Sequence, residues 1–160
     1  MKPVIIYFSN SGITEKLALK IKKDTEADII KVIPEKEYGG YLISIIKMIG
    51  EKISKQTRKF TNDIPDLSSY DTVFAGYPVW GGKAPVIFTD FLKECDMDGK
   101  IVIPFSTAGA SSIKGSLPGI KAACGNVRIK YPFETSKRRK GDYRSWIDKI
   151  RSTDIVKHLK

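Results

Sequence analysis

The stretch VIIYFSNSGIT, residues 4–14, decides the fold. Its first five residues form an apolar run that predicts a buried strand, and the polar residues after them predict a tight loop. Ile13, Leu17 and Ile21 then recur at helical spacing, so a helix is expected over about residues 12–23. In a strand–loop–helix unit, hydroxyls and free backbone N–H groups point at one spot, where the helix N-terminus favours an anion. The stretch therefore predicts a phosphate site.

Two common phosphate motifs are absent from this stretch. No Gly-Lys-Ser/Thr closes the loop, which excludes a Walker loop, and no GxGxxG marks a dinucleotide fingerprint. The loop suggests a phosphate held by hydroxyls and amides rather than by a lysine or a metal. The structural alternative is a simple capping motif, with Ser11 as the helix N-cap.

Length and composition indicate one domain, residues 1–160, with an ordinary apolar content of 41%. The longest apolar stretches, residues 4–8 and 101–103, are too short to cross a bilayer, and the start does not form a signal peptide. Cys95 and Cys124 lack CxxC spacing, so we expect buried thiols and no metal site. These features predict a cytoplasmic protein.

The chain is basic, with 28 Lys and Arg against 18 Asp and Glu, a net charge of +10. Much of this charge is local, in the run 137–140 and in a second basic region over 47–59. One interpretation is a solvated surface, and another is a docking face for an acidic partner. Nucleic acid is a poorer fit, because aromatic residues are not interleaved with the basic run.

Strand-like and helix-like segments alternate along the whole chain. The expected strands cover residues 3–8, 27–32, 72–77, 100–105 and 126–131. The expected helices cover residues 12–23, 42–53 and 84–95, with a last helix around Trp146 and Ile150, and residues 55–69 form a loop. This alternation predicts an α/β fold, with a five-stranded parallel sheet between two helical layers. Ligands of such sheets bind beyond the carboxyl ends of the strands.

Three of these strand ends carry distinctive loops. After the first loop comes YPVWGGK, residues 77–83, where two glycines follow a flat tryptophan, and then STAGASS, residues 106–112, which is small and polar. Taken singly, Trp80 could be a packing residue and the third loop a flexible turn. Together the loops suit one ligand with a phosphate at one end and a flat, hydrogen-bonding ring at the other. Flavin mononucleotide (FMN) has that shape.

The chain resembles the flavodoxin family in residues 6–14, 76–82 and 104–109, and the resemblance extends over essentially the whole domain. It implies a flavodoxin-like sheet in the order 2-1-3-4-5 that binds FMN. Carried over residue by residue, it implies contacts to the phosphate from Ser9, Asn10, Ser11, Gly12, Ile13 and Thr14, to the ring from Pro78, Val79, Trp80, Gly81 and Gly82, and to the pyrimidine edge from Thr107, Ala108 and Gly109. The hydroxyls of Ser9, Ser11 and Thr14 are the expected direct phosphate ligands.

Two departures from the family affect the expected function. The third loop lacks the second aromatic that covers the flavin in many relatives, so Tyr38, Phe133 or Tyr143 supplies that cover or the face is open. The chain is also basic, whereas electron-carrying flavodoxins tend to be acidic.

The leading expectation is an electron carrier that works with a protein partner and needs no catalytic side chain, because the flavin supplies the redox chemistry. The alternatives are an NAD(P)H-dependent FMN oxidoreductase that reduces a quinone or flavin, and a flavin-free module that binds through its basic face.

Overall fold

A computed structural model describes residues 2–35, 60–153 and 155. In chain order the elements are β1 (Val4–Tyr7), α1 (Ile13–Thr25), β2 (Asp28–Lys31), β3 (Thr72–Pro78), α3 (Val86–Glu94), β4 (Ile101–Ala108), the 3₁₀ turn η1 (Ile113–Ser116), α4 (Leu117–Cys124), β5 (Arg128–Ile129), β6 (Phe133–Ser136) and α5 (Tyr143–Arg151). The strands form one sheet in the order β2-β1-β3-β4-β5, and every pair is parallel. The predicted fold class and strand order are confirmed.

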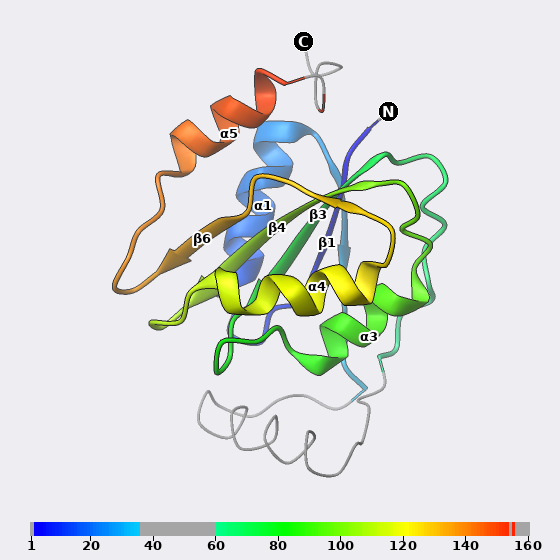
Figure 1. Ribbon diagram of the computed structural model, residues 1–160, viewed down its shortest axis with the longest axis horizontal. Coiled ribbons are helices and arrows are strands. Elements are labelled where there is room, and N and C mark those ends of the chain that lie inside the picture. Colours follow the sequence, from blue (N-terminus) through cyan, green and yellow to red (C-terminus); the bar gives the residue numbers. More distant parts are fainter. Residues whose placement is uncertain (1, 36–59, 154, 156–160) are drawn as a thin grey trace.

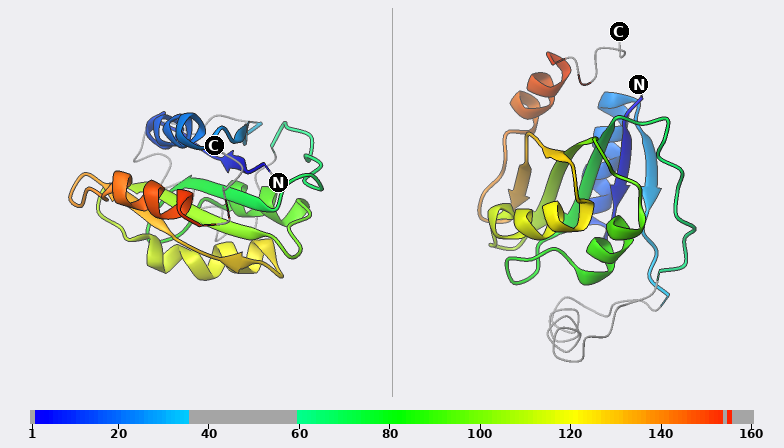
Figure 2. Two further views of the ribbon diagram at one scale, coloured as in Figure 1. Left: turned by 90° about the horizontal axis from the view of Figure 1, so that it is seen from above. Right: turned by 45° about the vertical axis from the view of Figure 1, so that its right-hand side comes forward.

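The sheet lies between two helical layers, with α3 and α4 in front of it and α1 behind it in Figure 1 and α1 and α4 on opposite sides in the left view of Figure 2. Successive residues of a strand point to opposite faces. Ile6 of β1 accordingly packs with α3 residues such as Phe88, whereas its neighbour Ile5 packs with Ile21 of α1 and Ile147 of α5. Burial of both faces explains the nearly continuous apolar strands.

Gly76 of β3 lies directly opposite Phe105 of β4. A Cβ atom at Gly76 would lie 2.1 Å from Cζ of the buried Phe105 ring, so only glycine fits at this position. The ring therefore fills the space beside the central strand, just before the ends of β3 and β4.

The predicted fifth strand, residues 126–131, was wrong in its extent. Only Arg128 and Ile129 form β5, because Tyr131 adopts a left-handed backbone (φ 48°) and the following Pro132 cannot donate a ladder hydrogen bond. The chain then returns to the sheet as β6, which pairs with the last four residues of β4. Neither β6 nor α4 was predicted as an individual element.

Several other boundaries shift by a few residues. β4 continues to Ala108, so Ser106 and Thr107 belong to the strand and not to the predicted loop. The predicted helix over 42–53, Tyr38 and the second basic region lie outside the described residues. Among the helices of the described part of the chain, none is long and apolar enough to cross a membrane.

Candidate functional site: a pocket at the carboxyl edge of the sheet

A pocket of about 880 Å³ opens beyond the carboxyl ends of β1, β3, β4 and β6. It is lined by Asn10, Ser11, Ile13, Pro78, Val79, Trp80, Thr107, Ala108, Gly109, Thr135, Ser136, Lys137, Lys140 and Gly141. This volume is within the range of pockets that bury a cofactor-sized ligand, roughly 300–1,000 Å³. The pocket thus occupies the position at which open parallel sheets bind their ligands.

The loop after β1 leaves the start of α1 without a side-chain cap. The N-cap is Gly12, in a left-handed conformation (φ 81°), and this residue has no side chain to accept a hydrogen bond from the first helical N–H groups. The alternative with Ser11 as N-cap is therefore wrong, and Ser11 is instead exposed at the pocket. Ser9 fixes the turn, because its Oγ accepts a 3.1 Å hydrogen bond from the N–H of Gly12.

A buried hydrogen bond connects the start of α1 to the end of β4. The hydroxyl oxygens of Thr14 and Thr107 lie 2.8 Å apart, and both side chains are almost fully buried. Thr107 reaches the pocket, but Thr14 does not line it. The Thr14 hydroxyl therefore joins two walls of the pocket.

The loop after β3 makes a tight reversal at Gly81 and Gly82. Both glycines have positive φ angles, 54° and 75°, and paired backbone hydrogen bonds of 2.9 and 3.0 Å join Trp80 and Lys83 across the turn. A two-residue turn with both φ angles positive has type I′ character and favours glycine. The glycines thus make the turn, while Trp80 packs edge-on against Phe8 with ring centroids 5.9 Å apart and contributes to the pocket wall.

Besides the loops after β1 and β3 and the end of β4, the pocket has a wall formed by β6 and the residues after it. The sequence analysis did not predict this wall. Because β6 pairs with the end of β4, residues 135–141 lie at the same edge of the sheet as residues 107–109. The N–H of Lys137 donates a 3.3 Å hydrogen bond to the carbonyl of Ala108. The basic run 137–140 is evident in the sequence. Its place at the pocket depends on β6, and a strand of four residues is difficult to predict from sequence.

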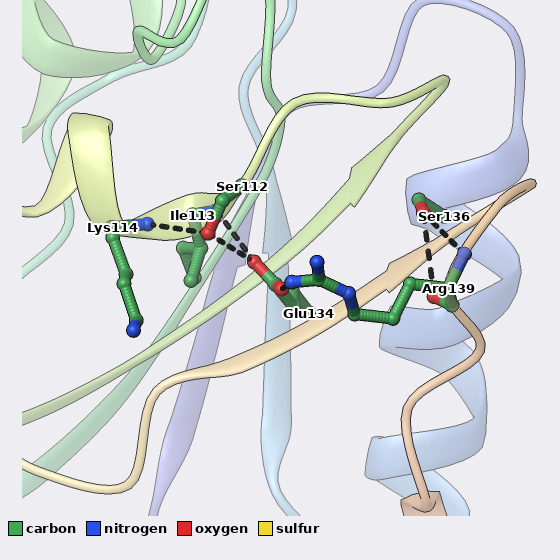
Figure 3. Close-up of polar contacts among 6 residues, drawn as sticks. All are labelled: Ser112, Ile113, Lys114, Glu134, Ser136 and Arg139. Carbon is green, nitrogen blue, oxygen red and sulfur yellow. Dashed lines mark hydrogen bonds and ion pairs between the residues drawn. The ribbon is translucent and has the colours of Figure 1, made fainter.

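Glu134 of β6 joins this wall to the segment after β4 (Figure 3). Its carboxylate accepts hydrogen bonds of 2.7 Å from the N–H of Ile113, 2.8 Å from the hydroxyl of Ser112 and 3.0 Å from the guanidinium of Arg139. Burial raises the pKa of Glu134, but these donors outweigh it and hold the pKa below its ordinary value. The carboxylate is therefore charged at neutral pH.

The predicted site residues divide into two groups. The structure brings together Asn10, Ser11, Ile13, Pro78, Val79, Trp80, Thr107, Ala108 and Gly109 around the pocket. The others do not line it, namely Ser9, Gly12, Thr14, Gly81 and Gly82. The second group belongs to the turns and to the Thr14–Thr107 contact that shape the walls.

Comparison with known proteins agrees with this architecture. A sequence model of the flavodoxin family matches residues 2–150. The chain belongs to the flavodoxin family. Among proteins with curated functional descriptions, none matches the sequence.

Solved structures similar to this flavodoxin-family chain include two proteins described, provisionally, as flavoproteins. One, from Bacteroides eggerthii, is 27% identical with a TM-score of 0.78, and the match covers 95% of this chain and 99% of that one. The other, from Bacteroides uniformis, is 25% identical with a TM-score of 0.74, covering 94% and 97%. A flavoprotein from Lactobacillus acidophilus, solved in complex with FMN, shares the fold at 19% identity, a TM-score of 0.72, and coverage of 83% and 92%.

Two aromatic side chains considered as flavin covers lie elsewhere in this flavodoxin fold. Phe133 is buried against Trp146, with centroids 4.7 Å apart, and is not part of the pocket wall. Tyr143 packs on the same cluster and donates a 2.8 Å hydrogen bond to Asp24. Among the described residues, Trp80 is therefore the aromatic side chain of the pocket wall.

Proposed function

We propose that this chain binds FMN and carries electrons to or from a protein partner. The observation that carries the proposal is the pocket at the carboxyl edge of the sheet, where the uncapped start of α1 meets the ends of β3 and β4. Membership of the flavodoxin family and the similar fold of an FMN complex support the choice of cofactor.

Residues 9–14 would hold the phosphate. The N-cap Gly12 offers no side chain to the first N–H groups of α1, and a 13-residue helix adds a partial positive charge at this end. Ser11 is exposed at the pocket and is the best placed hydroxyl. Thr14 would contribute mainly its N–H, because its hydroxyl is engaged with Thr107. These donors suit a phosphate monoester without a metal.

Residues 78–80 and 107–109 would hold the ring. Trp80, Val79 and Pro78 offer an apolar wall, while Ala108 and Gly109 are small enough for the main chain to approach a planar ligand closely. FMN would supply the redox chemistry at this site, and the protein's contribution is orientation, exclusion of water and the local charge.

A second candidate function is an NAD(P)H-dependent FMN oxidoreductase. It is favoured by the small side chains of the wall formed by residues 107–109, which leave one side of the pocket without an aromatic among the described residues. Oxidation of NAD(P)H by the purified protein, with no separate reductase, would select this function over the carrier.

FMN titration of the purified protein, followed by absorbance and fluorescence quenching, tests the proposal. We expect saturable binding that Ser11→Glu weakens at least about tenfold, because the new carboxylate repels the phosphate. Riboflavin, which lacks the phosphate, should be much less affected by the same change. The matched control is Ser69→Glu, at an exposed serine near the opposite edge of the sheet. A protein that binds no FMN would refute the proposal and leave the flavin-free binding module.

A further inference from the structure

The basic loop, defined as Lys137, Arg138, Arg139 and Lys140, forms one side of the proposed flavin pocket. Lys137 and Lys140 are both exposed and line the pocket, and Arg138 between them is exposed as well. A ligand or partner that approaches the pocket from this side meets their positive charges first.

Hydrogen bonds close the basic loop on itself and join it to Glu134 (Figure 3). The N–H of Ser136 donates 2.8 Å to the carbonyl of Arg139, and the N–H of Arg139 donates 2.9 Å to Oγ of Ser136, so the loop closes on itself. The guanidinium of Arg139 is bonded to Glu134, which is anchored to Ile113. The loop is therefore built into the pocket wall by its main chain and by Arg139.

Its remaining charges have no acidic partner among residues 2–35 and 60–153. Arg139 of the loop forms an ion pair with Glu134, and no described carboxylate pairs with Lys137, Arg138 or Lys140. Adjacent like charges repel one another, so fixing them in one loop has an electrostatic cost. An anionic surface placed against the loop would offset that cost.

Further exposed basic side chains lie on two helices, with the carboxylate of Asp142, which accepts hydrogen bonds from Ser145, between the loop and α5. Lys20 of α1 lies over the ring of Tyr143 in α5, with Nζ 3.7 Å from the ring centroid. Lys16 is on the same side of α1, one turn nearer the pocket, and Arg144 is at the start of α5, and both are exposed. Exposed basic side chains on a loop and on two helices are more than a small anionic substrate requires, and they favour a macromolecule.

We propose that the basic loop, with Lys16, Lys20 and Arg144 beside it, is the docking surface for an acidic protein partner. The partner would cover the pocket mouth, which is the position from which electrons can pass to or from the bound flavin. That electron-transfer role rests on the proposed function, whereas the docking itself does not. Aromatic side chains suited to base stacking are not interleaved in the loop, so a protein fits better than a nucleic acid.

Binding to two haem proteins of opposite charge tests the docking surface. The FMN-loaded protein and its FMN-free form are titrated with acidic cytochrome b5 and basic cytochrome c in a calorimeter. Salt is set at about 0.01 M and about 0.15 M, where the screening lengths are about 30 and 8 Å. The test variant is K137Q/R138Q/K140Q. The control, K22Q/K93Q/R128Q, removes equal charge from exposed positions near the opposite edge of the sheet.

We expect wild-type protein to bind cytochrome b5 at low salt, with or without FMN, and not cytochrome c. The test variant should lose at least about tenfold in affinity and most of the salt dependence, whereas the control variant should lose less than threefold. Equal losses in the two variants would mean a diffuse charge effect and would overturn the proposal. Unchanged binding by the test variant, or preferential retention on nucleic acid, would overturn it too.

Failure of the proposed function would give a different result. A wild-type protein that binds cytochrome b5 through the basic loop but takes up no FMN would refute the cofactor and leave the docking surface intact. Because Lys137 and Lys140 line the pocket, the test variant is compared with wild type in the FMN-free form as well, and a loss of cytochrome b5 binding confined to the FMN-loaded form would overturn the proposal.

Discussion

Glu134→Ala removes the carboxylate that joins the basic loop to the segment after β4. Three hydrogen bonds are lost, to the N–H of Ile113, the hydroxyl of Ser112 and the guanidinium of Arg139. Each hydrogen bond to a charged group contributes roughly 1.5–3 kcal/mol when buried, but an exposed ion pair contributes only about 0–1 kcal/mol. Arg139 is 75% exposed and Glu134 24% exposed, so water replaces part of the loss. We expect a destabilisation of about 2 kcal/mol.

Urea denaturation and thermal unfolding of wild-type protein and the variant provide the measurement. For a chain of this length, about 2 kcal/mol corresponds to a fall in Tm of roughly 4–8 °C. Glu134→Gln keeps an acceptor for the N–H of Ile113 and should lose about half as much. An Ala variant within about 0.5 kcal/mol of wild type would show that the Glu134 contacts do not hold the loops together.

The difference in the free energy of unfolding between wild type and Glu134→Ala should depend on pH. The pKa of Glu134 is lower in the folded protein than in the unfolded chain, because its hydrogen-bond donors favour the charged form. Its contribution to stability is complete above the unfolded pKa, near 4.5, and is lost as the pH falls through the folded pKa. The stability gap between wild type and Glu134→Ala should therefore be constant from pH 8 to 6 and narrow toward pH 3. A gap that is independent of pH would contradict the charged hydrogen bonds.

Further predictions concern the core and the buried polar groups. Gly76→Ala should destabilise the fold by about 1–3 kcal/mol in urea denaturation, because the Phe105 ring must move, and adding Phe105→Leu should recover part of the loss. A double variant that is no more stable than Gly76→Ala would argue against this contact. Thr107→Val should cost about 1–2 kcal/mol and weaken FMN binding, since its buried hydroxyl partner is left unpaired. Equal stability and equal affinity would refute the role of that bond. Cys95 and Cys124 are buried, and burial raises the pKa of each thiol to about 12, so native protein should react with iodoacetamide at pH 8 far more slowly than urea-unfolded protein.

The sheet was predictable because its central strands are short apolar runs, each followed by a recognisable loop. The run from Val4 to Phe8 and the run from Val102 to Phe105 are buried on both faces, which leaves few alternatives to a parallel strand. The family's loop motifs then locate the pocket to within a few residues.

The edge of the sheet was not predictable in the same way. Residues 126–131 alternate like a strand, but Tyr131 and Pro132 interrupt the pairing, and β6 depends on contacts with β4 that are distant in sequence. The hydrogen bond of Thr14 to Thr107 and the contacts of Glu134 are likewise long-range. The spacing of apolar and polar residues within a segment does not indicate which residues distant in sequence will contact one another.

The contact between Glu134 and Arg139 constrains the number of residues in the basic loop, but it does not constrain which side chains stand at positions 137 and 138. Arg139 must reach back to Glu134, and its N–H and carbonyl must meet Ser136, so an inserted or deleted residue would break these contacts. Lys137 and Arg138 use no described side-chain contact to hold the loop. Exchanging their side chains should thus change which molecules this surface attracts while the pocket beside it keeps its shape.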